Sequence, residues 1–169
     1  RNQIVFKADK EDQPGFWVMN PDGTQKRYLG QSEKLEEEYK AIYQKETFSP
    51  DGRYQVVPWR NEHTGDTVVQ VYIRGTDTDG NPVSRRITNC SKNCYDPVWA
   101  PDGHRIAFVS PEWESDDIWV INPDGKEWWN YTPNKWEWEK HPSWSPDSTK
   151  ITFWSNREGT KQIYVIDEN

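Results

Sequence analysis

The chain has 169 residues and is acidic, with 28 Asp and Glu against 21 Lys and Arg and a net charge of −7. A surface that binds nucleic acid normally carries a basic patch, and this sequence shows none, so nucleic acid is not expected as a partner. No apolar segment approaches the ~20 residues of a membrane-spanning helix, and the chain does not open with the pattern of a secretory leader. We therefore expect no membrane insertion, although a leader removed before residue 1 would leave the same sequence.

Residues 1–30 are expected to form the first of four repeated units. A strand over residues 2–8 begins the unit, and an apolar strand that ends at Met19 precedes an Asn-Pro-Asp-Gly turn over residues 20–23. In such a turn proline presets the backbone, aspartate bonds back onto the turn and glycine takes the left-handed conformation. A polar strand over residues 25–29 then completes the unit.

Residues 31–44 form an insertion between the first and second units. Leu35, Tyr39 and Ile42 fall near helical spacing, which indicates a short helix. A long connection running into the next strand is the alternative, and the sequence leaves both open.

The second repeat is expected over residues 41–88. Its first turn is Ser-Pro-Asp-Gly, and an aromatic residue, Phe48, directly precedes that turn. Two later units, residues 95–132 and 141–169, have Trp99 and Trp144 at that position. After each aromatic-led turn the sequence predicts short strands over residues 54–57, 69–73, 84–88, 105–109, 117–121, 127–132, 150–154 and 162–166.

The spacing of the aromatic-led turns predicts the fold. Their aspartates, Asp51, Asp102 and Asp147, lie 51 and 45 residues apart. This period with four short strands per repeat is typical of a β-propeller blade, whereas an antiparallel sandwich would not repeat so regularly. We therefore expect an all-β chain of about four antiparallel blades with strands A to D, the first and last blades incomplete, giving three, four, four and three strands.

Three arrangements stay open for such a chain. It is either a fragment of a larger propeller of six to eight blades, a half-ring that pairs with a second copy of itself, or a closed ring of four blades. Unpaired strand edges at the two ends of the series favour pairing with another chain.

The last two units resemble the propeller repeat of the TolB family. The resemblance rests on residues 96–103 with 119–125 and on residues 141–147 with 163–166, and the loop of residues 155–159 resembles the B–C loop of that family. It extends over nearly the whole chain as one domain, residues 1–169, but is looser in the first two blades. The resemblance implies a bacterial and often exported protein, periplasmic or extracellular, with a cytoplasmic location still open. It also implies protein–protein contact and does not imply an enzyme, although related blades accompany the catalytic domains of some serine peptidases.

In a propeller the Pro-Asp-Gly turns lie on one face and the B–C and D–A loops on the other, and binding residues concentrate on such loops. Five tryptophans are candidates there because core packing does not obviously require them: Trp113, Trp128, Trp129, Trp136 and Trp138. If residues 136–139 are extended, both indoles lie on one side and both carboxylates on the other.

These residues predict one of two kinds of site. The first is a surface for a protein partner or a second copy of the chain, and the alternative is a platform for a saccharide or a small flat ligand. In both, Glu137, Glu139 and His141 would supply the polar contacts. Packing of the same rings beneath neighbouring loops is the explanation that requires no ligand.

Cysteines and acidic residues add weaker candidates. Cys90 and Cys94 are either free thiols or a local disulfide of an exported protein. No cofactor is expected, and calcium is a minor alternative. Residues 77–81 begin like a calcium loop, with Asp77 and Asp79, but Pro82 stands where glycine is required. The second acidic cluster comprises Glu112, Glu114, Asp116 and Asp117.

Catalysis is not expected. The sequence contains no Gly-x-Ser-x-Gly elbow, no His-Glu-x-x-His and no phosphate-binding glycine loop, and His63, His104 and His141 fall in different blades. A paired-carboxylate hydrolase that uses Glu137 or Asp116, or an accessory propeller of a hydrolase, remains an alternative.

Overall fold

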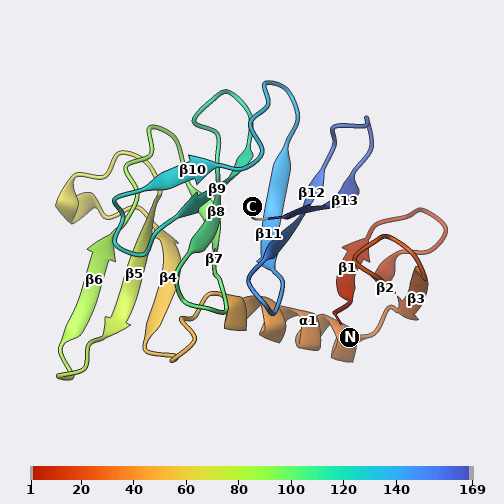
Figure 1. Ribbon diagram of the computed structural model, residues 1–169, viewed down its shortest axis with the longest axis horizontal. Coiled ribbons are helices and arrows are strands. Elements are labelled where there is room, and N and C mark those ends of the chain that lie inside the picture. The colour runs from red at the N-terminus through yellow and green to blue at the C-terminus, as the bar shows by residue number, and fades with distance from the viewer. Residues whose placement is uncertain (1, 168–169) are drawn as a thin grey trace. The chain divides into compact units, whose positions relative to one another are not determined.

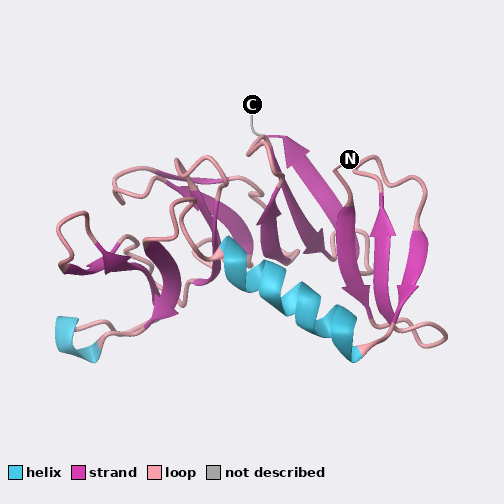
Figure 2. Cartoon of the chain, turned by 90° about the horizontal axis from the view of Figure 1, so that it is seen from below, coloured by secondary structure: helices cyan, strands magenta, loops and turns pink. Residues whose placement is uncertain are grey.

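The computed structural model describes residues 2–167, and the chain divides after Lys45 into two compact units. From here on, the first unit is the part up to Lys45, the second unit is the part from Glu46 onward, and the sequence repeats are called blades. Antiparallel strands dominate both units, and α1 (Glu33–Glu46) is the longer of the helices in the described chain (Figure 2). Four sheets of three or four strands follow one another along the sequence, as the all-β expectation requires.

The first unit contains a three-stranded meander, β1 (Ile4–Ala8), β2 (Gly15–Met19) and β3 (Arg27–Gly30), followed by α1. The insertion is therefore a helix and not a long connection. Ser32 begins it, because its Oγ accepts a hydrogen bond from the backbone N–H of Leu35 at 3.2 Å. Within this unit the helix packs on the sheet through Tyr39, whose ring centroid lies 5.3 Å from that of Phe16.

The second unit contains three sheets, drawn side by side in Figure 1. Their strands follow one another in chain order, each antiparallel to the next. The first sheet is β4 (Tyr54–Trp59), β5 (Gln70–Thr76) and β6 (Pro82–Arg86); the second is β7 (Tyr95–Trp99), β8 (Ile106–Ser110), β9 (Asp117–Ile121) and β10 (Trp128–Asn130); the third is β11 (Glu139–Trp144), β12 (Lys150–Ser155) and β13 (Gln162–Asp167). A short 3-10 helix, η1 (Glu62–Thr64), lies in the loop between β4 and β5.

One strand of the expected set is absent from the second blade. Four strands were expected there, but the A strand is reduced to an isolated bridge between Phe48 and Gln55. Good helix formers with acidic residues in the first turn extend α1 to Glu46. Too few residues then remain before the turn at Ser49 to form a strand.

The Pro-Asp-Gly turns form as the sequence predicts. Each closes with a backbone hydrogen bond from the glycine position, at 2.9 Å from Gly103 N to Ala100 O and from Gly125 N to Asn122 O. The aspartate carboxylate accepts a second bond from the backbone two residues on, as Asp102 does from His104 at 2.9 Å. These residues are thus fully used by the turns.

The core of the second unit lies between the sheets. Both β8 and β9 are buried along their whole length, as expected for the central strands of a blade covered on both faces. Phe108, Ile106 and Ile121 are at most 1% exposed. This packing fixes the strand ends from which the loops between β8 and β9 and between β10 and β11 start.

Candidate interaction surface

Three exposed tryptophans lie on the loops at one end of the second unit. Trp113 is in the B–C loop between β8 and β9 and is 55% exposed. Trp136 and Trp138, in the D–A loop between β10 and β11, are 79% and 50% exposed. Because neighbouring strands are antiparallel, both loops emerge at the end opposite the Pro-Asp-Gly turns (Figure 1). We call Trp113, Trp136 and Trp138 the indole face.

The other two candidate tryptophans lie in β10. Trp128 is half-buried, with its ring centroid 5.1 Å from that of Trp119 and 6.0 Å from that of Phe108, so packing accounts for its position. Trp129 is 45% exposed but is a strand residue, paired with Val120. Neither belongs to a loop of the indole face.

A single asparagine organises the D–A loop from below. The Asn134 side-chain amide donates to Asp117 Oδ1 at 3.0 Å, to the carbonyl of Thr132 at 3.0 Å and to Glu139 Oε2. Its carbonyl oxygen accepts from the backbone N–H groups of Trp136 at 3.2 Å and of Glu137 at 2.9 Å. The backbone that carries Trp136 is therefore anchored to the blade.

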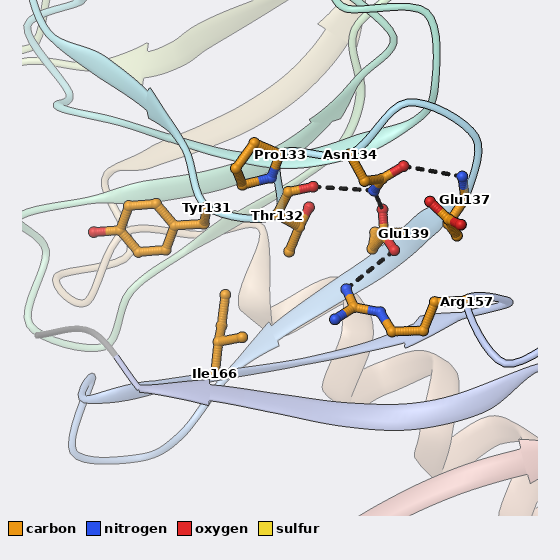
Figure 3. A pocket seen from close by; sticks show the side chains of 8 residues that line it. All are labelled: Tyr131, Thr132, Pro133, Asn134, Glu137, Glu139, Arg157 and Ile166. Atoms are coloured by element: carbon orange, nitrogen blue, oxygen red, sulfur yellow. Dashed lines mark hydrogen bonds and ion pairs between the residues drawn. The ribbon is translucent and has the colours of Figure 1, made fainter.

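The far end of the loop is fixed by Glu139, which is fully buried. Its Oε1 accepts from Ser155 Oγ at 2.7 Å and from the Arg157 guanidinium at 3.1 Å, and Figure 3 shows the carboxylate between Asn134 and Arg157. The side chains in this segment alternate: the indoles of Trp136 and Trp138 are exposed, Glu137 is half-buried and Glu139 points inward. Glu139 thus acts from beneath the loop.

Asp117 is the second buried carboxylate of this network. Burial raises its pKa to about 7, and the neighbouring carboxylates of Glu139 and Asp116 act in the same direction, against the hydrogen bond from Asn130. That bond, from Asn130 Nδ2 to Asp117 Oδ2, is 2.7 Å long. Asp117 is therefore the carboxyl of this network that titrates near neutral pH.

Two hollows flank the Asn134 loop. One, of about 320 Å³, is lined by residues that include Asn134, Glu137 and Arg157 (Figure 3). The other, of about 540 Å³, lies between the two loops of the indole face and includes Glu112, Trp113 and Lys135. The indole face is therefore bordered by two recesses that combine charged side chains with apolar surface.

His141 lies on the inner strand β11, away from the exposed loop. Its Nδ1 is 2.9 Å from Asp96 Oδ2 of β7. Asp96 and His141 both have positive φ, 50° and 54°, and each precedes a proline at the bulge of an A strand. The two residues are equivalent positions of consecutive blades, and their contact joins the inner strands.

Cys90 and Cys94 form a disulfide within the D–A loop that precedes β7. This loop holds Glu112 of the neighbouring B–C loop. Glu112 Oε1 accepts from the backbone N–H of Ser91 at 2.5 Å, and Oε2 accepts from Ser91 Oγ at 2.8 Å. The residue next to Trp113 is thus fixed by the disulfide loop.

The acidic metal candidates have protein partners. Asp77 accepts from the backbone of Asp79 at 2.9 Å and of Asn81 at 2.8 Å, as in an aspartate turn, and Asp116 pairs with Lys140 at 2.8 Å. Among residues 2–167 no three His, Cys, Asp or Glu side chains are grouped to hold a metal ion. Calcium binding stays a prediction for titration.

Sequence reasoning missed the roles of Asn134, Ser155 and Arg157. No motif marks Asn134, and the loop of residues 155–159 stood out only for its resemblance to the B–C loop of the family. One signal was available: Thr88 and Thr132 each end an expected D strand, residues 84–88 and 127–132. The structure shows them to be equivalent, because each Oγ1 accepts from the second backbone N–H of the middle or next-to-last strand of its sheet, Val71 of β5 at 2.9 Å and Ile118 of β9 at 2.8 Å. The residue two positions after each threonine is Cys90 in one blade and Asn134 in the next, so the two occupy equivalent positions in the repeat.

Repeated antiparallel meanders that place their loops at a common end define a β-propeller protein. The family model of the TolB beta propeller domain matches residues 47–169, and the chain belongs to that family. It is 33% identical over 89 residues to the protein TolB homolog of Chlorobium luteolum, covering 52% of this chain and 20% of that protein. It is 25% identical over 114 residues to the Tol-Pal system protein TolB of Ruthia magnifica subsp. Calyptogena magnifica, covering 68% and 26%.

Among solved structures, the chain is similar to the putative TolB from Agrobacterium tumefaciens, with a TM-score of 0.59 and 20% identity over 98% of this chain and 56% of that one. This likeness supports the propeller fold. The chain spans only about a fifth to a quarter of the length of its two curated relatives, 20% and 26%. No helix formed by residues 2–167 combines the length and apolar character needed to cross a bilayer.

Proposed function

We propose that the chain is a non-catalytic propeller segment that binds another protein through the indole face. The observation that carries the proposal is the exposure of three indoles, between 50% and 79%, on loops that side-chain hydrogen bonds hold in place. Large rigid aromatic side chains contribute strongly to protein interfaces, and their entropy loss on binding is small when the backbone is already fixed.

Family membership supports the same function. The relative from Ruthia magnifica subsp. Calyptogena magnifica is named as a Tol-Pal system protein, so components of a Tol-Pal system are the first partners to test. The Cys90–Cys94 disulfide supports an oxidising compartment, since disulfides persist in exported proteins and are rare in reducing ones. We therefore place the protein in the periplasm or outside the cell.

The test compares two variants that remove exposed indoles from different places. The double variant W136A/W138A removes two indoles of the indole face, and W129A removes an indole of similar exposure from β10. Binding to purified Tol-Pal components is measured by calorimetry. We expect the double variant to weaken binding by tenfold or more, since hot-spot tryptophans are worth about 2 kcal/mol or more each, and W129A to bind like the wild type.

Two results would contradict the proposal. Equal loss in W129A and in the double variant would show that the indole face is not special, and saturable binding of an oligosaccharide that depends on Trp136 would favour the saccharide alternative. Light scattering tests the second-copy alternative, because a self-associated pair has twice the 20.0 kDa mass of one chain.

A further inference from the structure

We infer that Glu112 is a positioning residue for the indole face and that the Cys90–Cys94 disulfide loop holds its carboxylate in place. This inference rests on the proposed function, because Trp113 is one of the three exposed indoles. It assigns to the disulfide a role beyond the stability of its own loop: the loop holds the segment that presents Trp113, so the presentation of that indole depends on the oxidation state of the two cysteines.

The disulfide loop is anchored in the core of the second unit. The disulfide closes a loop of five residues, with 6.4 Å between the Cα atoms of Cys90 and Cys94. Both cysteines are buried, at 6% and 0% exposed, so the base of the loop belongs to the core. The Val69 carbonyl accepts from Cys94 N at 2.9 Å, and the buried Gln70 side chain bonds the backbone of Cys90.

The disulfide loop binds the carboxylate of Glu112. The backbone N–H groups of Ser91 and Lys92 both point at Glu112 Oε1, at 2.5 and 3.4 Å, and the Ser91 hydroxyl donates to Oε2 at 2.8 Å. Successive backbone N–H groups that converge in this way form a concave anion site. Bonds to a charged acceptor are the stronger class of hydrogen bond. The disulfide loop is therefore an anion site that is occupied by the Glu112 carboxylate of the same chain.

The Glu112 carboxylate is linked to the Trp113 indole through the chain. Trp113 directly follows Glu112, and its ring meets Trp119 edge-on at a centroid distance of 5.2 Å. On the other side of Trp113, Glu114 has a φ of 95°, a conformation that non-glycine residues seldom adopt. With Glu112 held, the B–C loop presents Trp113; with Glu112 released, the strained loop has fewer contacts that hold it there.

Reduction of the Cys90–Cys94 disulfide would disrupt the site that holds Glu112. A dithiol reductant attacks the Cys90–Cys94 bond, so that the two cysteines become thiols with two electrons and two protons, while the reductant becomes a disulfide. Without the crosslink the loop gains conformational freedom, and its N–H groups no longer converge on Glu112. Trp113 would then lose its fixed position.

The experiment follows the indole N–H signals of the full chain labelled with ¹⁵N-tryptophan. The signal absent from W113F identifies Trp113. We expect this signal to shift and broaden in E112A and after addition of dithiothreitol, and to stay near its wild-type position in E112Q, whose amide oxygen still accepts from Ser91. The matched control is E114A, because Glu114 is the next glutamate of the loop and is exposed; it should leave the Trp113 signal in place.

A Trp113 signal that is unchanged in E112A would overturn the inference, as would an equal change in E114A. If reduction leaves the Trp113 signal in place, or moves all the indole signals together, the dependence of Trp113 on the disulfide is refuted, and E112A with the disulfide intact tests the role of Glu112 by itself. These spectra need no partner. A failure of W136A/W138A to affect binding would therefore refute the proposed function while leaving the result for Trp113 separate.

Discussion

The side-chain amide of Asn134 donates a hydrogen bond to the buried carboxylate of Glu139, five residues further along the chain. The pair occupies the positions that Cys90 and Cys94 hold one blade earlier. The backbone shows the equivalence: Cys94 N donates to Val69 O at 2.9 Å, and Glu139 N donates to Asp116 O at 2.7 Å. One D–A loop is thus closed by a covalent bond and the next by a polar network.

We predict that N134A destabilises the second unit by about 1–3 kcal/mol, because it leaves the buried carboxylates of Asp117 and Glu139 without the shared amide donor. Urea unfolding measures the change. N81A is the control: the Asn81 side chain donates to the exposed Asp77 carboxylate at 3.3 Å, so a loss below about 0.5 kcal/mol is expected. Equal effects of the two substitutions would refute the network's role.

A second prediction concerns pH and Glu46. Burial raises the pKa of Glu46 to about 7, against the opposing effect of the hydrogen bond that its Oε1 accepts from Ser143 at 2.7 Å. The folded state then binds more protons than the unfolded state between pH 4.5 and 7, so this contribution to stability is present in full below pH 4.5 and is lost as pH rises through 7.

The variant E46Q removes this titration and keeps the acceptor oxygen. We expect it to be more stable than the wild type at pH 8 by about 1–3 kcal/mol, and the difference to shrink toward pH 5. Unfolding curves over that range provide the measurement. A difference that does not depend on pH would show that the Glu46 carboxyl is ionised in the folded protein. Asp117, whose pKa is also about 7, gives both proteins a common slope of the same sign.

The third prediction compares two turn glycines. Gly80 and Gly125 both have positive φ, 83° and 79°, so alanine at either position costs about 1 kcal/mol of backbone strain. At Gly125 an added Cβ would also lie 2.9 Å from the carbonyl oxygen of Ile87, whereas at Gly80 it meets nothing within 4 Å. We expect G125A to cost at least about 1 kcal/mol more than G80A in urea unfolding. Equal losses would show that the Ile87 backbone shifts freely.

The fourth prediction concerns calcium. The Asp77 carboxylate is already used by backbone N–H groups, and Asp116 pairs with Lys140 at 2.8 Å. We expect millimolar calcium to change the midpoint of thermal unfolding by less than about 1 °C, since a ligand stabilises only in proportion to its binding of the folded state. A midpoint that rises steadily with calcium concentration would contradict this expectation, and D79A would then test the turn of residues 77–81.

The sequence alone determined the repeat, every expected strand except the A strand of the second blade, and the end of the molecule that carries the variable loops. These features depend on local chemistry: Pro, Asp and Gly specify a turn whatever surrounds them, and short alternating or apolar runs between turns specify strands. The same local reasoning found the helical spacing of Leu35, Tyr39 and Ile42. It could not predict that the helix replaces the A strand of the second blade, because that outcome depends on how far α1 extends toward Phe48.

Only the tertiary structure decided which residues act together. Trp128 and Trp136 look alike in sequence, yet one packs on Trp119 and the other is 79% exposed. The roles of Asn134 and Glu112 arise from contacts with loops and strands distant in sequence, such as that between Ser91 and Glu112 across 21 positions. Burial and hydrogen-bond partners depend on which blades come together, and no local pattern carries that information.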